Sequence, residues 1–166
     1  MAPCVLWIDE IEKGIATGDN DGGTSQRVLG CLLTWMAEKT QAVFLVATAN
    51  DISALPPELL RKGRFDEIFF VDLPSEEIRS QIYGIHLGNR VKHGEQFNIH
   101  ALATNSQGFS GAEIEQTVVA ALYASHAQQE PLAQKHITEA IKNTKPLSVI
   151  LAEKIQDLRH WAADRT

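Results

Sequence analysis

Three short runs of consecutive apolar residues stand in the first half of the chain, at residues 4–8, 43–47 and 68–71. Runs that are apolar at every position are typical of parallel strands buried on both faces. Between the first two runs, Ser25 is a candidate N-cap for a helix with apolar residues at helical spacing. Pro56 and Pro57 suit the first turn of a short helix through Leu60. The pattern in the first part of the chain therefore predicts an α/β fold with a parallel sheet.

After Pro74 the pattern changes from strands and helices to helices alone. Ser75 begins a capping pattern, and no strand-like run follows. Helices are predicted over residues 75–89, 98–105, 110–127, 134–143 and 147–164. We therefore expect an α/β part over residues 1–74, an all-α part over 75–145 and a C-terminal helix within 146–166.

Net charge, apolar runs and cysteine content limit the kinds of partner and the cellular compartments that fit this chain. The 166 residues carry a formal net charge of −6, which argues against a bulk nucleic-acid or anionic-membrane binder. The run at residues 4–8 is interrupted by Asp9 and Glu10, so it is neither a secretion signal nor the roughly 20-residue span of a membrane helix. Cys4 and Cys31 are expected to be buried free thiols in a reducing compartment, either the cytoplasm or a plastid stroma.

Two carboxylates stand at the end of the first predicted strand. Ligands of open α/β sheets bind at the carboxyl ends of parallel strands, and Mg²⁺ prefers oxygen donors. Asp9 is therefore a candidate for holding the Mg²⁺ of a bound nucleotide through water, and Glu10 for orienting and polarising the attacking water. The alternative is a strand that simply ends in solvated acids.

Polar groups after the second strand extend this candidate site. The neutral amide of Asn50 could donate a hydrogen bond to a terminal phosphate or to the attacking water, although Asn is also common where a strand turns. Arg61 and Arg64 flank Gly63, and guanidinium groups match the geometry of phosphate. The alternative is a solvated basic turn, in which Asp66 or Glu67 pairs with Arg64.

The order of these motifs resembles that of the AAA+ ATPases, and the stretch from Asn50 to Asp66 resembles the second region of homology of the AAA clade. The resemblance implies that Asp9 and Glu10 form Walker B and that Asn50 is sensor 1. It also implies that Arg61 and Arg64 are arginine fingers acting on the nucleotide of a neighbouring subunit. ATP and Mg²⁺ would be the cofactors. The parent would be a hexameric ring that couples ATP hydrolysis to remodelling or regulation of a protein partner.

The helical part resembles the lid of the same module, and residues 1–74 would then belong to the large ATPase subdomain. Ile82 and His86 match positions that pack on the base and ribose, and Gly111 with Ala112 matches the lid turn. Ala112 stands where other AAA+ proteins place a sensor 2 arginine, so no such arginine is expected in cis. The C-terminal stretch resembles the uncharacterised AAA ATPases of cyanobacteria and algal plastids.

One motif of the family is not found in the sequence. A phosphate-binding loop needs Gly-Lys followed by Ser or Thr, and no Gly-Lys dipeptide occurs in the chain. We therefore expect a partial product that begins within the ATPase domain, folds as an inactive assembly piece and self-associates through the edges of strands 43–47 and 68–71. A different P-loop NTPase, such as a helicase-like motor, is the other enzyme class considered. The paired arginines and the helical lid argue against it.

Overall fold

The computed structural model describes residues 2–15, 23–61, 63–90 and 97–163. The chain divides into two compact units, Met1–Phe69 and Phe70–Thr166. Each unit has its own buried apolar cluster, and each is considered by itself below.

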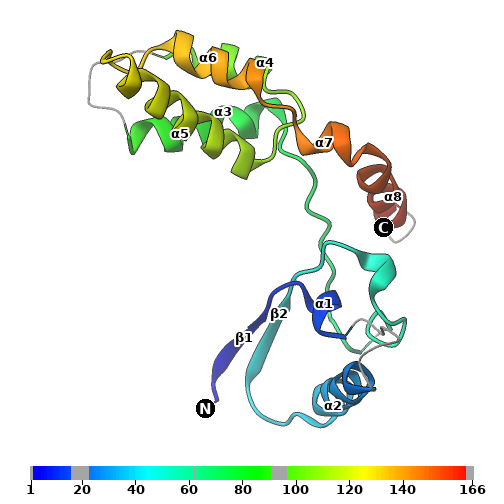
Figure 1. Cartoon of the computed structure of the whole chain (residues 1–166). Coiled ribbons are helices and arrows are strands. Elements are labelled where there is room, and N and C mark those ends of the chain that lie inside the picture. The colour runs from blue at the N-terminus through cyan, green and yellow to red at the C-terminus, as the bar shows by residue number, and fades with distance from the viewer. Residues whose placement is uncertain (1, 16–22, 62, 91–96, 164–166) are drawn as a thin grey trace. The chain divides into compact units, whose positions relative to one another are not determined.

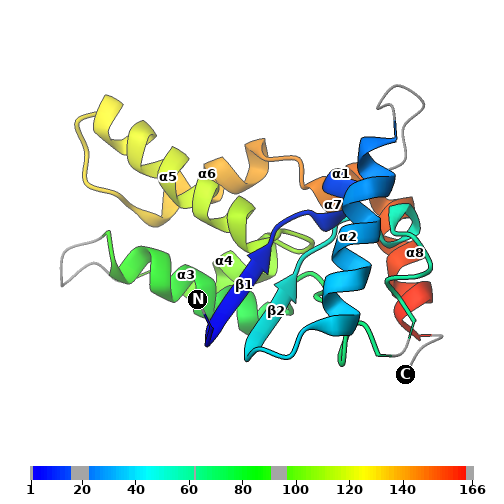
Figure 2. The same cartoon turned by 90° about the horizontal axis from the view of Figure 1, so that it is seen from below.

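The first unit is built on two parallel strands, β1 (Cys4–Ile8) and β2 (Val43–Ala47), which occupy the predicted positions. They pair in register, with Leu6 opposite Leu45, and lie side by side in both views (Figures 1 and 2). The connection contains α1 (Ile11–Ile15) and α2 (Thr24–Glu38), and the short 3₁₀ helix η1 (Ile52–Ala54) follows β2. The order strand, helix, parallel strand is a crossover of the kind that places helices on one face of a sheet.

Only one face of this sheet is covered. Ile8, Leu45 and Ala47 pack against a core formed by α1, α2 and the residues after β2, and its buried members are Ile11, Ile15, Met36, Leu55 and Leu59. On the opposite face Val5, Trp7 and Phe44 are 66%, 62% and 69% exposed. The expectation of strands buried on both faces was therefore wrong for this chain, because the two helices can cover only one side of a two-stranded sheet. Cys4 and Cys31 are free, as expected, but both are exposed rather than buried.

The predicted third strand at residues 68–71 is not formed. Phe69 and Val71 are 82% and 88% exposed, and the described residues contain no backbone hydrogen bond from this segment to β1 or β2. A strand exists only by pairing with a neighbour, and apolar sequence cannot supply that neighbour.

Two local details of the first unit also differ from the sequence prediction. Gly23, at φ 83°, occupies the N-cap of α2, so the helix begins before Ser25. Left-handed backbone of this kind is cheap only for glycine. The segment after Pro56 makes two tight turns, with Leu59 N–H donating to Pro56 O (3.0 Å) and Leu60 N–H to Pro57 O (3.1 Å), rather than a helix.

All the regular elements described in the second unit are helices, as the pattern after Pro74 predicts. Its helices are α3 (Glu76–Gly88), α4 (Ile99–Asn105), α5 (Gly111–Ala127), α6 (Gln134–Asn143), α7 (Leu147–Ile150) and α8 (Ala152–Ala163). The first four agree with prediction to within a residue at each end, and they pack around buried Tyr83, Leu102, Ile114, Val118 and Ile137. The single helix predicted over 147–164 is instead broken at Leu151, whose φ and ψ of −107° and 28° leave the helical region.

Local hydrogen bonds explain where these helices begin. Ser75 caps α3, and Ser110 with Glu113 forms a capping box at the start of α5. The other oxygen of Glu113 accepts a hydrogen bond of 2.7 Å from Leu147 N–H, which ties α7 to α5. Burial opposes ionisation of Glu113, but the hydrogen bonds from Ser110 and Leu147 outweigh it and hold the pKa of this carboxyl below its ordinary value.

Two arginines fix the ends of the second unit. Arg79 is only 6% exposed. Its Nε and Nη2 donate to Ala103 O over 3.1 Å and 3.0 Å, and its Nη1 donates to Pro74 O over 2.8 Å. The buried guanidinium therefore holds the chain that enters α3 against the end of α4.

Arg159 of α8 makes two 2.8 Å hydrogen bonds to Asp72 and holds the pKa of that carboxyl below its ordinary value.

Candidate functional site

The ends of β1 and β2 are joined at the carboxyl edge of the sheet. Thr48 N–H donates to Ile8 O (3.0 Å), and Ile11 N–H donates to Thr48 O (2.9 Å). The residues that directly follow each strand are therefore held next to one another. This is the edge at which open α/β sheets bind their ligands.

A hydrogen-bonded cluster of polar side chains occupies this edge. Asn50 Nδ2 donates to Glu10 Oε1 over 2.7 Å. Thr48 Oγ1 donates to Asp9 Oδ1 over 2.5 Å and accepts from Glu10 N–H over 3.0 Å. The structure thus brings together Asp9, Glu10 and Asn50, three of the residues singled out in the sequence. Sequence reasoning missed Thr48, although a hydroxyl at the end of the second strand was a usable signal.

Glu10 has an unusual backbone. Its φ is 48°, in the left-handed region that residues other than glycine seldom adopt. Such strain persists only where the surrounding contacts enforce it, and it concentrates at functional sites. Here the enforcing contacts are the hydrogen bonds of the Glu10 main chain to Thr48 and of its side chain to Asn50, both of which lie just after β2.

Lys13, a residue that the sequence patterns did not single out, also contacts the cluster. Its Nζ lies 2.5 Å from Glu10 Oε2, and this hydrogen bond raises the pKa of Lys13. Asn50 and Lys13 together place one donor on each oxygen of Glu10, which fixes the plane of the carboxylate.

The two candidate arginines lie outside this network. Arg64 is half-buried, and its NH1 donates to Leu33 O of α2 over 2.8 Å. Neither Asp66 nor Glu67 forms a described ion pair with it, so the alternative of a surface pair with either residue is wrong. Arg61 is exposed, and Gly63 between them has φ 88°. No described hydrogen bond joins either arginine to Asp9, Glu10 or Asn50.

The residues proposed to contact the base and ribose lie in the second unit. Ile82 packs against its core, and a Cβ on Gly111 would lie 3.7 Å from Ile82 Cδ1, so α3 and α5 approach closely there. Ala112 is exposed in the first turn of α5. His86 Nδ1 lies 2.8 Å from Nη1 of Arg90, and Nη2 of the same guanidinium donates to Glu115 Oε1 over 2.6 Å.

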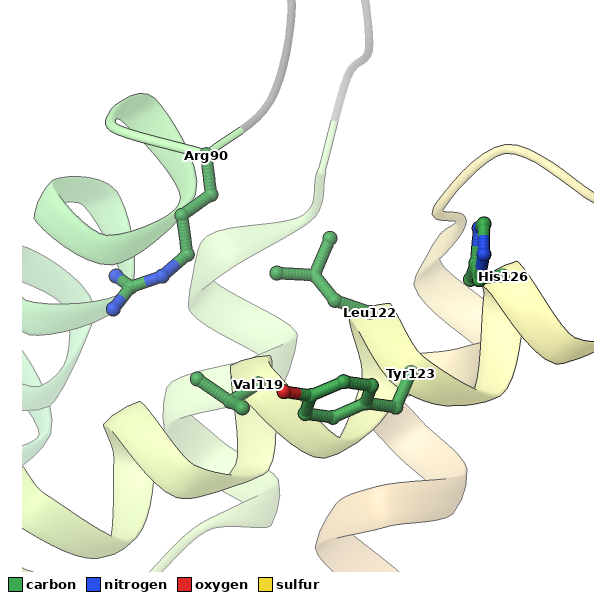
Figure 3. Close-up of a pocket in the computed structure, with 5 residues that line it drawn as sticks. All are labelled: Arg90, Val119, Leu122, Tyr123 and His126. Atoms are coloured by element: carbon green, nitrogen blue, oxygen red, sulfur yellow. The ribbon is translucent and has the colours of Figure 1, made fainter.

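A shallow hollow of about 470 Å³ lies next to Arg90. Figure 3 shows Val119, Leu122, Tyr123 and His126 along α5, with Arg90 on the segment that follows α3. None of the residues assigned to the base and ribose lines it, although Arg90, which does, contacts His86.

The donor set at the edge of the sheet fits Mg²⁺ carried by a nucleotide. All its ligand atoms are oxygens of carboxylate, hydroxyl or amide groups, the type that this cation prefers. In the described part of the chain, no group of three or more His, Cys, Asp or Glu residues is arranged to hold a metal. Magnesium at phosphate sites normally takes one or two carboxylates and completes its shell with water and phosphate oxygens, a requirement that Asp9 can meet.

Comparison with known proteins identifies the class. Residues 1–73 match the family model described as "ATPase family associated with various cellular activities (AAA)". The two parallel strands and the helical remainder agree with part of an AAA fold. Residues 1–73 therefore match the AAA ATPases.

Among known proteins, the chain is similar to the "Uncharacterized AAA domain-containing protein ycf46" of Pyropia yezoensis, at 44% identity over 99% of this chain and 34% of that protein. The protein of the same name from Trieres chinensis is 43% identical over 98% of this chain and 33% of its own length. The chain thus spans about a third of these relatives. It is also 37% identical, over 84% of its length and 21% of the relative's, to "ATP-dependent zinc metalloprotease FtsH" of an Aster yellows witches'-broom phytoplasma. None of the described helices is both long and apolar enough to cross a membrane.

Proposed function

We propose that this chain supplies the hydrolytic residues of an ATP site in an AAA protein, which couples ATP hydrolysis to remodelling or regulation of a protein partner. The observation that carries the proposal is the 2.7 Å hydrogen bond from Asn50 to Glu10 beside Asp9, at the carboxyl edge of a parallel sheet. A solvated strand end would not require Thr48, Asn50 and Lys13 to orient its two carboxylates.

Each residue has a defined task in this proposal. Asp9, oriented by the Thr48 hydroxyl, holds the cation, and Mg²⁺ when bound neutralises charge on the phosphate oxygens. Glu10 accepts a hydrogen bond from the attacking water and orients it. The Asn50 amide holds Glu10 and faces the same edge, so that it can also donate to water or to a phosphate oxygen without adding charge.

The rest of the chain fits the same assignment. Residues 1–74 would be the C-terminal part of the large ATPase subdomain, residues 75–145 the lid and residues 146–166 a C-terminal helical extension. Ile82, His86, Gly111 and Ala112 would contact the base and ribose. Arg61 and Arg64 would act in a neighbouring subunit of a ring. The cytoplasm or a plastid stroma is the proposed location.

A second proposal concerns the chain by itself. These 166 residues contain no Gly-Lys pair, so they do not provide the loop that cradles nucleotide phosphates. In isolation the chain would then be a folded but catalytically inactive assembly piece. Magnesium-dependent phosphate release by the isolated chain would contradict this second proposal and leave the first intact.

Replacing Asp9 by asparagine in the intact protein tests the cation site. We expect Mg²⁺-dependent ATP binding to weaken at least tenfold, a difference of about 1.4 kcal/mol, because one ligand charge is lost. Binding is measured by titration with ATP at fixed Mg²⁺ and again in EDTA, where the variant and the wild type should be alike. Asp157→Asn, the same change on exposed α8, is the control and should bind normally. Equal Mg²⁺ dependence in wild type and Asp9→Asn would reject the assignment.

The exposed face of the sheet predicts self-association of the isolated chain. Val5, Trp7 and Phe44 form a contiguous apolar surface on paired strands, and both outer strand edges lack a partner in the described residues. Light scattering should therefore give a mass above that of the monomer. The measured mass should be lower for Phe44→Lys, because the substitution places a charge on the apolar surface. Tyr123→Lys, at a similarly exposed aromatic of the second unit, should leave the mass unchanged. A strictly monomeric wild-type chain would contradict this prediction.

A further inference from the structure

Glu12 is a buried carboxylate that the proposed roles do not use. It lies in α1, two residues after Glu10, and is only 6% exposed. Burying a carboxylate is costly unless hydrogen bonds or charges compensate for the lost water. A buried acid next to a proposed catalytic residue therefore needs a physical explanation.

The compensation for Glu12 comes from the segment that follows β2. Its Oε1 accepts a 3.0 Å hydrogen bond from the main-chain N–H of Asn50. Its Oε2 is buried without a hydrogen-bond partner among the described residues, and no described salt bridge involves it. A carboxylate is a strong acceptor for a main-chain N–H, so this single contact restrains the backbone of Asn50.

The restraint on Asn50 continues to Glu10. While Glu12 holds the main-chain N–H of Asn50, the side-chain Nδ2 of Asn50 donates to Glu10 Oε1 over 2.7 Å. Glu12 thus holds Asn50 through its main-chain N–H, and Glu10 holds it through its side-chain amide. Glu12 has no described contact with Glu10 or Asp9, and it is too buried to meet a substrate.

We infer that Glu12 is a positioning residue, which fixes the backbone of Asn50 so that the Asn50 amide orients Glu10. The inference rests on the proposed ATPase function. A purely structural role is the competing explanation, because Glu12 also links α1 to the segment that follows β2. The two explanations differ in whether the loss of Glu12 acts through Asn50.

Kinetics of the intact protein separate the two roles. Glu12→Met keeps the length of the side chain and removes the acceptor, whereas Glu12→Gln keeps an acceptor oxygen. We expect Glu12→Met to lower kcat on the order of 10²-fold, the effect of a small misplacement of a catalytic group, with the KM for ATP within about threefold of wild type. Glu12→Gln should restore kcat to within about threefold of wild type.

A double-mutant cycle then tests the route through Asn50. If Glu12 acts through Asn50, then Glu12→Met should add little to the loss already caused by Asn50→Ala, because residues that act as a unit are not additive. Fully additive losses would overturn the inference, as would an unchanged kcat in Glu12→Met.

Hydrogen exchange of backbone amides tests the contact without using catalysis. The Asn50 amide should be protected in the wild type and should exchange at least tenfold faster in Glu12→Met. The amide of Ile11, bonded to Thr48 O, is the internal control and should change little. An unprotected Asn50 amide in the wild type would overturn the inference even if Glu12→Met failed to fold. A wild-type protein without ATPase activity but with this exchange pattern would reject the proposed function and leave the contact established.

Discussion

Arg64→Ala should abolish most ATP turnover of the intact protein while ATP affinity stays nearly unchanged. An arginine supplied to the active site of a neighbouring subunit is worth roughly 10³–10⁵ in rate where such contributions have been measured. Arg64→Lys should not restore activity, because an ammonium lacks the planar fork that matches phosphate oxygens. Turnover is measured as phosphate release at saturating ATP, and affinity by nucleotide binding.

The contact between Arg64 and Leu33 gives the competing explanation. NH1 donates to the Leu33 carbonyl over 2.8 Å, so the substitution also removes a charged hydrogen bond worth about 1.5–3 kcal/mol. If that were the only role of Arg64, thermal unfolding would shift and the turnover of the remaining folded protein would not. Arg159→Ala, which breaks the ion pair with Asp72 in the other unit, is the matched control and should affect stability alone.

Mixing two inactive variants tests whether Arg64 acts between subunits. Rings assembled from Arg64→Ala and Glu10→Gln protein contain some interfaces with an intact Glu10 facing an intact neighbouring Arg64. Those interfaces should hydrolyse ATP, so activity should return with a maximum at intermediate mixing ratios. Mixed rings that form but stay inactive at every ratio would show that Arg64 does not act in trans.

Glu10→Gln should retain ATP binding and lose turnover by about 10²–10⁴-fold, the usual contribution of a positioned general base. Glutamine preserves the shape of the side chain and can still accept the hydrogen bond from Asn50 Nδ2. It lacks the negative charge needed to polarise water, and it no longer forms an ion pair with Lys13. The effect should therefore appear in kcat, with folding unaffected.

Phosphate release and nucleotide binding on the same preparation measure this effect. Glu77→Gln, at an exposed acid in the first turn of α3, makes the same chemical change away from the site and should behave as wild type. Normal turnover of the Glu10→Gln protein would reject the Walker B assignment of Asp9 and Glu10.

Local sequence signals were sufficient to predict most of the helices, both strands and the central residues of the candidate site. Capping residues such as Ser75 and Ser110, together with helical periodicity, located α3 to α6 because these signals act within a single turn. The apolar runs located β1 and β2. The sequence also assigned Asp9, Glu10 and Asn50, which follow two parallel strands, to one candidate site.

The distant groups that support the site, and the apolar surfaces that are covered, depend on how the chain packs in three dimensions. Thr48 and Glu12 contact partners 38 or 39 residues away in the chain, and no local pattern specifies such contacts. The segment at 68–71 is as apolar as β1, but it is not a strand because strand formation depends on a pairing partner. Trp7 and Phe44 are likewise exposed because burial depends on a neighbouring layer, and here the helices cover only the opposite face of the sheet.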